Sequence, residues 1–345
     1  MPESSEPKIV LAGSVNSSYR TLKALIRHRM RVAGVLGLSP SKSANVSGFT
    51  RMDLLAKESG VPFEEFDDLN AASVIETVRG WAPDVFFIVG LSQMVKKDLL
   101  SIPRLGCVGF HPTRLPEARG RAPVAWMTLE GRSGAATFFM MNEKADAGPI
   151  LVQEPFPVAE TDYSADVVQK LEAAMDAALD RWLPRLKSGE WRAVPQEDAK
   201  ATFYGKRNPE DGIIHWEWPA KKILALIRAA SQPYPGAYTF VGDGKLVVWR
   251  GELETDLPYR GVVGRIVHFD EARGWLVQTG DGLLWLTKTE WESPAGGSPP
   301  PKLRIGILLG SDPANDLYVL RQRITELETR IAGLEKSTAL SRKNP

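Results

Sequence analysis

The first 190 residues alternate between short apolar runs and segments with helical periodicity, which leaves the chain few possible folds. Strand-like runs lie at residues 8–14, 31–38, 61–66, 84–90, 106–111, 135–142 and 149–158. Helix-like segments lie at residues 17–29, 51–60, 71–81 and 164–189, the last ending at a glycine. Strands that alternate with helices are typical of βαβ units, in which neighbouring strands run parallel. We therefore predict a Rossmann-like α/β domain with a mostly parallel sheet over residues 7–190.

The chain changes character after residue 190. Residues 191–210 are polar and rich in turn-forming residues, as is typical of a linker. A helical segment at 219–230 is followed by short β-type runs, separated by glycine turns such as "GDGK" and "GDG". Such turns between β-forming residues are hairpin signals. We predict a small OB-like β-barrel domain over residues 211–310.

A third pattern occupies the C-terminal tail. Apolar residues recur there at alternating spacings of four and three, with arginines and glutamates between them: Leu320, Ile324, Leu327, Ile331 and Leu334. This is the heptad seam of a coiled coil. The alternative is a helix that packs on its own domain. We predict a coiled-coil helix over 313–338 that forms a homodimer.

Length, charge and cysteine content narrow the class of protein. A chain of 345 residues is long enough for two domains, because one core stops growing at about 250–300 residues. The 43 basic and 42 acidic residues nearly balance, so no overall charge draws the protein to nucleic acid or to a membrane. Cys107 is the only cysteine, which leaves no intramolecular disulfide and no cysteine-based metal site. The N-terminus lacks the apolar region of a signal peptide, and the apolar runs are too short to span a bilayer. We expect a cytoplasmic protein with no metal and no membrane partner.

Two polar residues follow the ends of predicted strands. His111 ends the run "GCVGFH", and Asp146 follows "AATFFMM". Ligands of doubly wound sheets bind outside the carboxyl ends of the strands, so both side chains should reach one edge. A carboxylate beside an imidazole fixes the tautomer of the ring and favours proton uptake, as a general base requires. The alternatives are a structural histidine and a turn residue that precedes Gly148.

The segments that contain these residues resemble a known family. "GFHPTRLPEARGRAPVAW" (109–126) and "ADAGPI" (145–150) are similar to the folate-dependent formyltransferases, which include methionyl-tRNA formyltransferase and the amino-sugar N-formyltransferases. The family pattern is a strand ending in Asn-x-His, then Leu-Pro, an Arg-Gly turn, Ala-Pro, and later Asp-x-Gly. The resemblance runs from about residue 8 to residue 308 and leaves out only the heptad tail.

The resemblance implies an enzyme that moves a formyl group from N10-formyltetrahydrofolate to a primary amine. His111 would be the general base and Asp146 its partner. The pterin of the folate would bind between a loop after the fourth strand and a segment after the sixth. The implied cofactor-binding residues are Leu91, Ser92, Met94, Val95, Met141, Asn142, Ala145 and Asp146.

Gly109 departs from the family pattern. Relatives place an asparagine two residues before the histidine, and its amide helps to hold the developing oxyanion. Glycine has no side-chain donor, and loss of one such donor typically costs about 10²–10³ in rate. Another donor or a water could fill the gap, the chemistry could be altered, or the protein could bind folate without turnover. Because His111, Asp146 and the arginine loop are retained, we expect an active enzyme.

The acceptor amine is less well defined by the sequence. Basic and acidic residues nearly balance between 200 and 310, and the segment after the second strand lacks the rich basic insertion expected for tRNA. We therefore expect a small amine, a nucleotide-linked amino sugar, with methionyl-tRNA as the alternative. Arg119 and Arg121 could instead brace the loop. The candidate substrate-binding residues are Asn16, Ser17, Pro112, Thr113, Arg114, Arg119 and Arg121.

Overall fold

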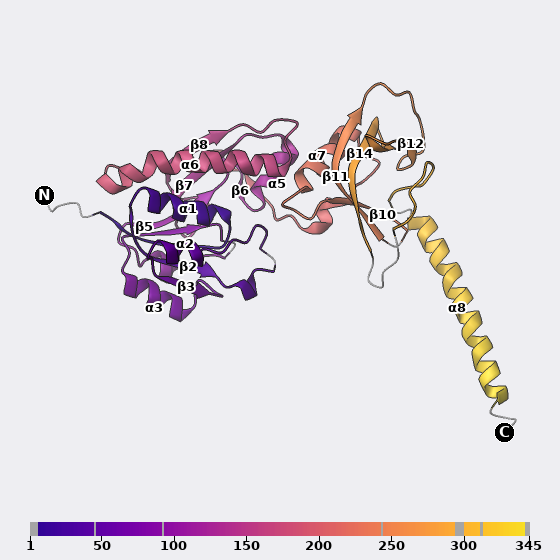
Figure 1. Ribbon diagram of the computed structural model, residues 1–345, viewed down its shortest axis with the longest axis horizontal. Helices are drawn as coiled ribbons and strands as arrows, with labels where there is room; N and C mark the ends of the chain where they lie inside the picture. The colour runs from indigo at the N-terminus through magenta and orange to yellow at the C-terminus, as the bar shows by residue number, and fades with distance from the viewer. Residues whose placement is uncertain are drawn as a thin grey trace. The chain divides into compact units, whose positions relative to one another are not determined.

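A computed structural model describes residues 6–44, 46–91, 93–242, 244–293, 300–310 and 313–341, with side chains of the final helix described over 317–334 (Figure 1). The chain divides into two compact units. Unit 1 comprises the chain up to residue 212 together with 225–237, and unit 2 comprises 213–224 and the chain from 238 onward. The chain passes from one unit to the other three times, and one of these points falls within helix α7 (Ala220–Ala230).

Unit 1 is built on a seven-stranded sheet. In chain order its strands are β1 (Lys8–Gly13), β2 (Arg31–Leu38), β3 (Phe63–Phe66), β4 (Val85–Val89), β5 (Gly106–His111), β7 (Gly134–Met140) and β8 (Ile150–Phe156). The spatial order is β3-β2-β1-β4-β5-β7-β8. The first five strands pair in parallel, and β5–β7 and β7–β8 pair antiparallel. The predicted mostly parallel α/β sheet is confirmed.

Helices cover both faces of this sheet. They are α1 (Asn16–Arg27), α2 (Asp53–Glu58), α3 (Ala72–Trp81), α4 (Lys97–Leu100), α5 (Pro123–Glu130) and α6 (Ser164–Ser188). Alternate residues of one strand enter different cores, because side chains along a strand point to opposite faces. Ile9 and Leu11 of β1 share a core with residues of α1 and α6, whereas Val10 shares the other core with residues of α3. Figure 1 shows α6 and α3 on opposite sides of the sheet. Burial on both faces explains why these strands are continuously apolar in the sequence.

The strand order reverses between β1 and β4, since β1 has β2 on one side and β4 on the other. Such a reversal leaves a crevice at the carboxyl ends of the strands, where ligands of doubly wound folds bind. β5, next to β4, ends at His111 on the same edge. The sheet topology therefore places His111 beside the expected ligand crevice.

Unit 2 contains a five-stranded sheet in the order β10-β11-β14-β13-β12. Its strands are β10 (Ala237–Val241), β11 (Gly244–Glu254), β12 (Ile266–Asp270), β13 (Gly274–Gln278) and β14 (Leu283–Glu292). β11–β14, β13–β14 and β12–β13 are antiparallel, and Leu276, Leu283 and Trp285 form a small core. This sheet corresponds to the predicted β domain. The chain ends in the long helix α8 (Pro313–Ser341).

No helix in the described ranges combines the length and the apolar character that crossing a bilayer requires.

Candidate active site

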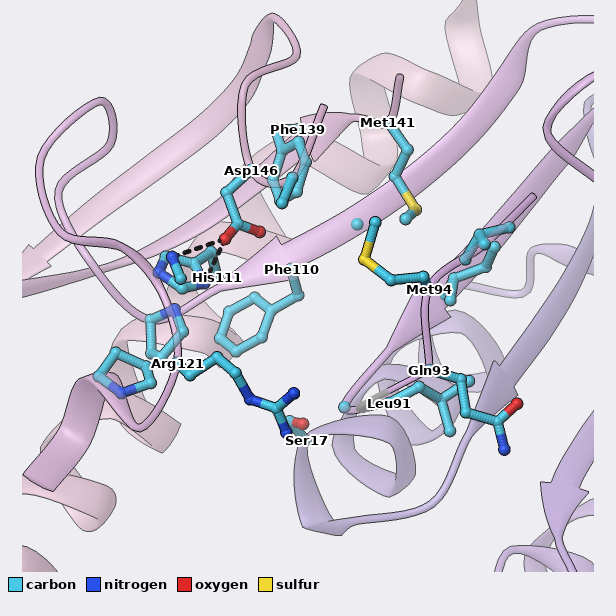
Figure 2. Close-up of a pocket in the computed structure, with 18 of the residues that line it drawn as sticks. Ser17, Leu91, Gln93, Met94, Phe110, His111, Arg121, Phe139, Met141 and Asp146 are labelled. Atoms are coloured by element: carbon cyan, nitrogen blue, oxygen red, sulfur yellow. Dashed lines mark hydrogen bonds and ion pairs between the residues drawn. The ribbon is translucent and has the colours of Figure 1, made fainter. Parts of the chain in front are cut away.

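His111 and Asp146 face each other at the edge of the sheet of unit 1 (Figure 2). Nδ1 of His111 lies 3.6 Å from Oδ2 of Asp146, and the His111 side chain is 6% exposed. The same carboxylate oxygen accepts a hydrogen bond from the backbone N–H of Gly120 at 2.9 Å. The expected pair is therefore formed between β5 and the turn that follows β7.

The backbone carbonyl of Ala118 determines which nitrogen of His111 carries hydrogen. Nε2 lies 2.9 Å from this oxygen, which can only accept, so Nε2 is the donor. In the neutral ring the lone pair then lies on Nδ1, the atom that faces Asp146. This corrects our expectation that Asp146 would fix the tautomer. The carboxylate of Asp146 instead lies beside Nδ1, the ring nitrogen that Ala118 does not engage.

Asp146 has a left-handed backbone conformation, which is uncommon among residues other than glycine and which aspartate tolerates better than most. Its φ is +53°, in the left-handed region that disfavours residues with a Cβ. Two residues later, a Cβ on Gly148 would lie 1.6 Å from the carbonyl oxygen of Met140. Only glycine permits this close backbone approach. The Asp-x-Gly motif therefore combines an aspartate in the left-handed backbone region with the glycine that the turn requires.

Part of the predicted linker contacts the loop that follows His111. The short strands β6 (Arg119–Gly120) and β9 (Phe203–Tyr204) pair in parallel. Thr202 accepts a hydrogen bond from Arg119 N–H through its carbonyl, at 2.9 Å, and from Ala118 N–H through its hydroxyl, at 2.8 Å. Residues 196–204, here named the strap, therefore belong structurally to the site.

A cavity of about 600 Å³ opens beside the His–Asp pair, a size typical of small-molecule sites. It brings together most of the predicted residues: Ser17, Leu91, Met94, Val95, Gly109, His111, Pro112, Arg121, Met141, Asn142, Ala145 and Asp146. Figure 2 shows Met94, Phe139 and Met141 along its wall. Ser92 lies outside the described residues.

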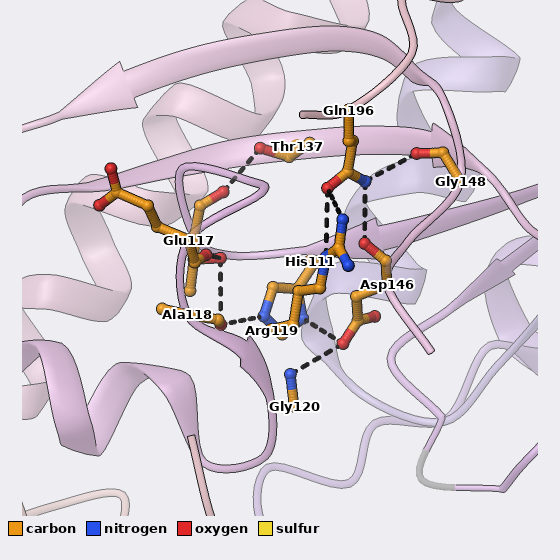
Figure 3. A network of polar contacts seen from close by, with 10 residues as sticks. His111, Glu117, Ala118, Arg119, Gly120, Thr137, Asp146, Gly148 and Gln196 are labelled. Carbon is orange, nitrogen blue, oxygen red and sulfur yellow. Dashed lines mark hydrogen bonds and ion pairs between the residues drawn. The ribbon is translucent and has the colours of Figure 1, made fainter. Parts of the chain in front are cut away.

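Four predicted substrate residues do not line this cavity: Asn16, Thr113, Arg114 and Arg119. Asn16 donates to Glu172, and the buried Thr113 hydroxyl donates to the carbonyl of Glu117. The guanidinium of Arg119 donates to Gln196 of the strap (Figure 3). It also donates to Asp198 of the strap. That hydrogen bond and the positive charge lower the pKa of the Asp198 carboxyl. Arg119 therefore braces the loop, one of the two roles left open for it by the sequence.

The space beside Gly109 is filled from the neighbouring strand. Gly109 lies opposite Phe139 in the antiparallel pairing of β5 with β7. A Cβ at Gly109 would lie 2.8 Å from the Phe139 ring and 3.0 Å from Cγ of Met141. The Phe139 ring therefore occupies the place of a Cβ at residue 109, and a side-chain amide there would require Phe139 and Met141 to shift.

Changing Gly109 to asparagine is accordingly expected to lower both stability and turnover. Overpacking of this kind typically costs about 1–3 kcal/mol. Thermal unfolding measures the stability loss, and the double variant Gly109→Asn/Phe139→Ala is expected to recover part of it. A single variant as stable as the wild type and with faster turnover would show that the space is open to an amide.

Our sequence reasoning did not identify Phe139, Gln196 or Thr202. Phe139 belongs to an apolar strand and carries no separate signal. Gln196 and Thr202 lie in a polar stretch whose two-residue strand is too short to produce periodicity. The glycine at 109 was the one available hint, and only for Phe139, because a glycine inside a strand often marks close packing by a neighbour.

The fold and the cavity together define an α/β protein with an acid–base pair at the ligand crevice of its sheet. Comparison with known protein families identifies the family to which the chain belongs. The model of the formyl transferase family matches residues 31–183, and that of the formyl transferase C-terminal domain matches residues 206–295. Together they cover well over half of the chain. The chain belongs to the formyl transferase family, which confirms the resemblance seen in its motifs.

Solved structures share this fold. The N-formyltransferase from Helicobacter canadensis, in complex with folinic acid and dTDP-3-aminofucose, is 14% identical with a TM-score of 0.60, over 82% of this chain and 100% of that one. HypX from Aquifex aeolicus in complex with tetrahydrofolic acid is 19% identical with a TM-score of 0.59, over 83% of this chain. The match spans only 44% of HypX. Methionyl-tRNA formyltransferase from Clostridium thermocellum is 18% identical with a TM-score of 0.53, over 73% of this chain and 95% of that one.

Proposed function

We propose that the protein transfers a formyl group from N10-formyltetrahydrofolate to the primary amine of a small acceptor, a nucleotide-linked amino sugar. The observation that carries this proposal is the His111–Asp146 pair on the wall of a cavity of about 600 Å³. Membership of the formyl transferase family supports the reaction class.

The cavity suits the folate. Leu91, Met94 and Val95 line it from the loop after β4, and Phe139 and Met141 line it from β7 and the residue that follows. Apolar side chains on facing walls favour a flat heteroaromatic ring such as a pterin. Asp146 and its neighbours then provide polar groups at one end of the same cavity.

The geometry of His111 indicates how protons are transferred during the reaction. Nδ1 takes a proton from the attacking amine as the new carbon–nitrogen bond forms. Nδ1 then returns this proton to the nitrogen that leaves as the original carbon–nitrogen bond breaks. Asp146 stabilises the charged ring between the two events, while Ala118 holds Nε2. General acid–base catalysis of this kind contributes about 10²–10⁴-fold.

Arg121 supports an acceptor that carries phosphate. Its side chain lines the cavity, and within the described residues its guanidinium makes no hydrogen bond or ion pair. Guanidinium groups bind phosphate oxygens in a bidentate manner. Ser17 at the first turn of α1 offers a further hydroxyl on the cavity lining. The Helicobacter canadensis structure, which holds a nucleotide-linked amino sugar, is consistent with such an acceptor.

Spectrophotometric release of tetrahydrofolate tests the acceptor class. The reaction would contain N10-formyltetrahydrofolate with a nucleotide-linked amino sugar, with initiator methionyl-tRNA, or with no acceptor. We expect release only with the amino sugar. Arg121→Ala is expected to raise KM for the amino sugar by about 10–100-fold, because a charge-assisted hydrogen bond is lost. Arg114→Ala, at a residue that does not line the cavity, is the matched control and should leave KM unchanged. Tetrahydrofolate release that requires methionyl-tRNA would indicate tRNA formylation instead. Folate binding without any release would indicate a folate-binding protein without transferase activity.

We also propose that the protein is a homodimer held by α8. Its seam of five heptad residues is between 45% and 68% exposed: Leu320, Ile324, Leu327, Ile331 and Leu334. The isoleucines fall at a positions and the leucines at d positions, the combination that favours parallel two-stranded coiled coils. Arg323 at g would face Glu328 at e of a parallel partner, and the sequence repeats this spacing seven residues later. Charge and apolar pattern therefore both fit a second copy of this chain.

Introducing aspartate into the seam is expected to dissociate the dimer. Leu327→Asp buries a charge at a d position, whereas Thr329→Asp adds the same charge on the outer face of the helix at f. Light scattering coupled to size exclusion should give a dimer for the wild type and for Thr329→Asp, and a monomer for Leu327→Asp. A monomeric wild type would contradict the assignment.

A further inference from the structure

We propose that Gln196 is a positioning residue for Asp146, so that the strap sets the geometry of the proton-transferring pair. This inference deepens the proposed function and rests on it. Figure 3 shows the Gln196 side chain between the guanidinium of Arg119 and the turn that carries Asp146. The residue comes from a segment separated from Asp146 by 50 positions in the chain.

The contacts of Gln196 define the orientation of its amide. Oε1 accepts from the guanidinium of Arg119 at 2.8 Å. Nε2 donates to the carbonyl oxygens of Asp146 and Gly148, at 2.8 and 2.7 Å. A guanidinium only donates and a carbonyl only accepts, so the reverse orientation would break all of these bonds. Both hydrogens and the oxygen of the amide are therefore used.

These hydrogen bonds hold the turn at Asp146, the residue with the left-handed backbone conformation. Asp146 has a φ of +53°, a conformation that costs free energy and persists only when its surroundings enforce it. Gln196 fixes the carbonyl of Asp146 from one side, and Gly120 N–H holds the carboxylate from the other. Released from Gln196, the turn could relax toward φ below zero. The carboxylate would then move away from Nδ1 of His111.

Arg119 anchors Gln196 in turn. Its side chain is 5% exposed, and it also donates to Asp198 of the strap at 2.8 Å. The next residue in the chain, Gly120, provides the N–H that Asp146 accepts. The strap and the loop after β5 therefore converge on Asp146 from its backbone and from its side chain. A change of about 1 Å in such a geometry can lower a rate by about 10²-fold.

Two substitutions separate positioning from simple anchoring. Gln196→Glu keeps an acceptor for Arg119, and adds a charge to that contact, but turns a second acceptor toward the carbonyls of Asp146 and Gly148. Gln196→Ala removes both contacts. If Gln196 positions Asp146, both variants should lose about 10–100-fold in kcat. If Gln196 only anchors the strap through Arg119, Gln196→Glu should keep wild-type turnover, and that result would overturn the proposal.

Measuring the effect of Gln196→Glu in an Asp146→Asn protein distinguishes positioning of Asp146 from a purely structural role. In an Asp146→Asn chain, single-turnover rates with enzyme in excess should change less than about twofold on adding Gln196→Glu, because the group that Gln196 positions is already altered. A full additive loss would overturn the proposal. Thermal unfolding of each variant reports stability separately, and Lys200→Ala, an exposed change on the same strap, is the matched control. A wild type without transferase activity would instead reject the proposed function itself.

Discussion

Replacing His111 with alanine is expected to lower kcat for formyl transfer by about 10²–10⁴-fold, the usual contribution of a positioned general base. The loss follows from the arrangement of the ring. Nε2 is engaged by the carbonyl of Ala118, and Nδ1 alone faces Asp146 and can take up a proton. The initial rate of tetrahydrofolate release at saturating substrates measures the effect.

His111→Gln is the matched control for folding. A glutamine amide can still donate to the carbonyl of Ala118, but it offers no base in the place of Nδ1. We expect its thermal midpoint to stay near that of the wild type while its turnover falls as far as that of His111→Ala. Substantial turnover in the glutamine variant would contradict the assignment of Nδ1 as the proton acceptor.

Replacing Gly148 with alanine is expected to have the largest effect on stability at the site. The added Cβ would lie 1.6 Å from the carbonyl oxygen of Met140, and a backbone atom in a paired strand cannot move aside. Overpacking in a well-packed region lowers the free energy of unfolding by up to about 3 kcal/mol, occasionally more. We expect Gly148→Ala to lose at least this upper value. The turn that carries Asp146 would shift, so turnover should fall together with the thermal midpoint.

Gly80→Ala is the control for this change. Gly80 lies in α3, and nothing stands within 4 Å of the Cβ that alanine would add there. Alanine has a higher helix propensity than glycine, so this variant in the last turn of α3 should be as stable as the wild type or more so. Equal stability of the two alanine variants would show that the turn at Gly148 is less tightly packed than the structure indicates.

The sheet of unit 1 could be predicted because its strands leave a strong signal. Strands such as β4 are buried on both faces and read as continuous apolar runs. The direction of β7 and β8 could not be read in the same way. Both are short apolar runs like the others, and their antiparallel pairing depends on the connections between them.

The chemistry of the site was predictable where it lies in local motifs. His111, Asp146 and Gly148 belong to two short segments that resemble the family. The contacts that hold those segments come from far along the chain. Gln196 is 77 residues from Arg119, and Phe139 reaches Gly109 only through strand pairing. No local pattern in the sequence reports such partners, which is why the strap was interpreted as a linker.

Measuring the mass of the acceptor after the reaction tests His111-dependent formyl transfer most directly. A nucleotide-linked amino sugar would be incubated with N10-formyltetrahydrofolate and either the wild-type protein or His111→Gln. The wild type is expected to replace one hydrogen of the amine with a formyl group, whereas His111→Gln is expected to leave the mass unchanged. An amine left unchanged by a wild-type protein that binds the folate would rule out formyl transfer to this acceptor.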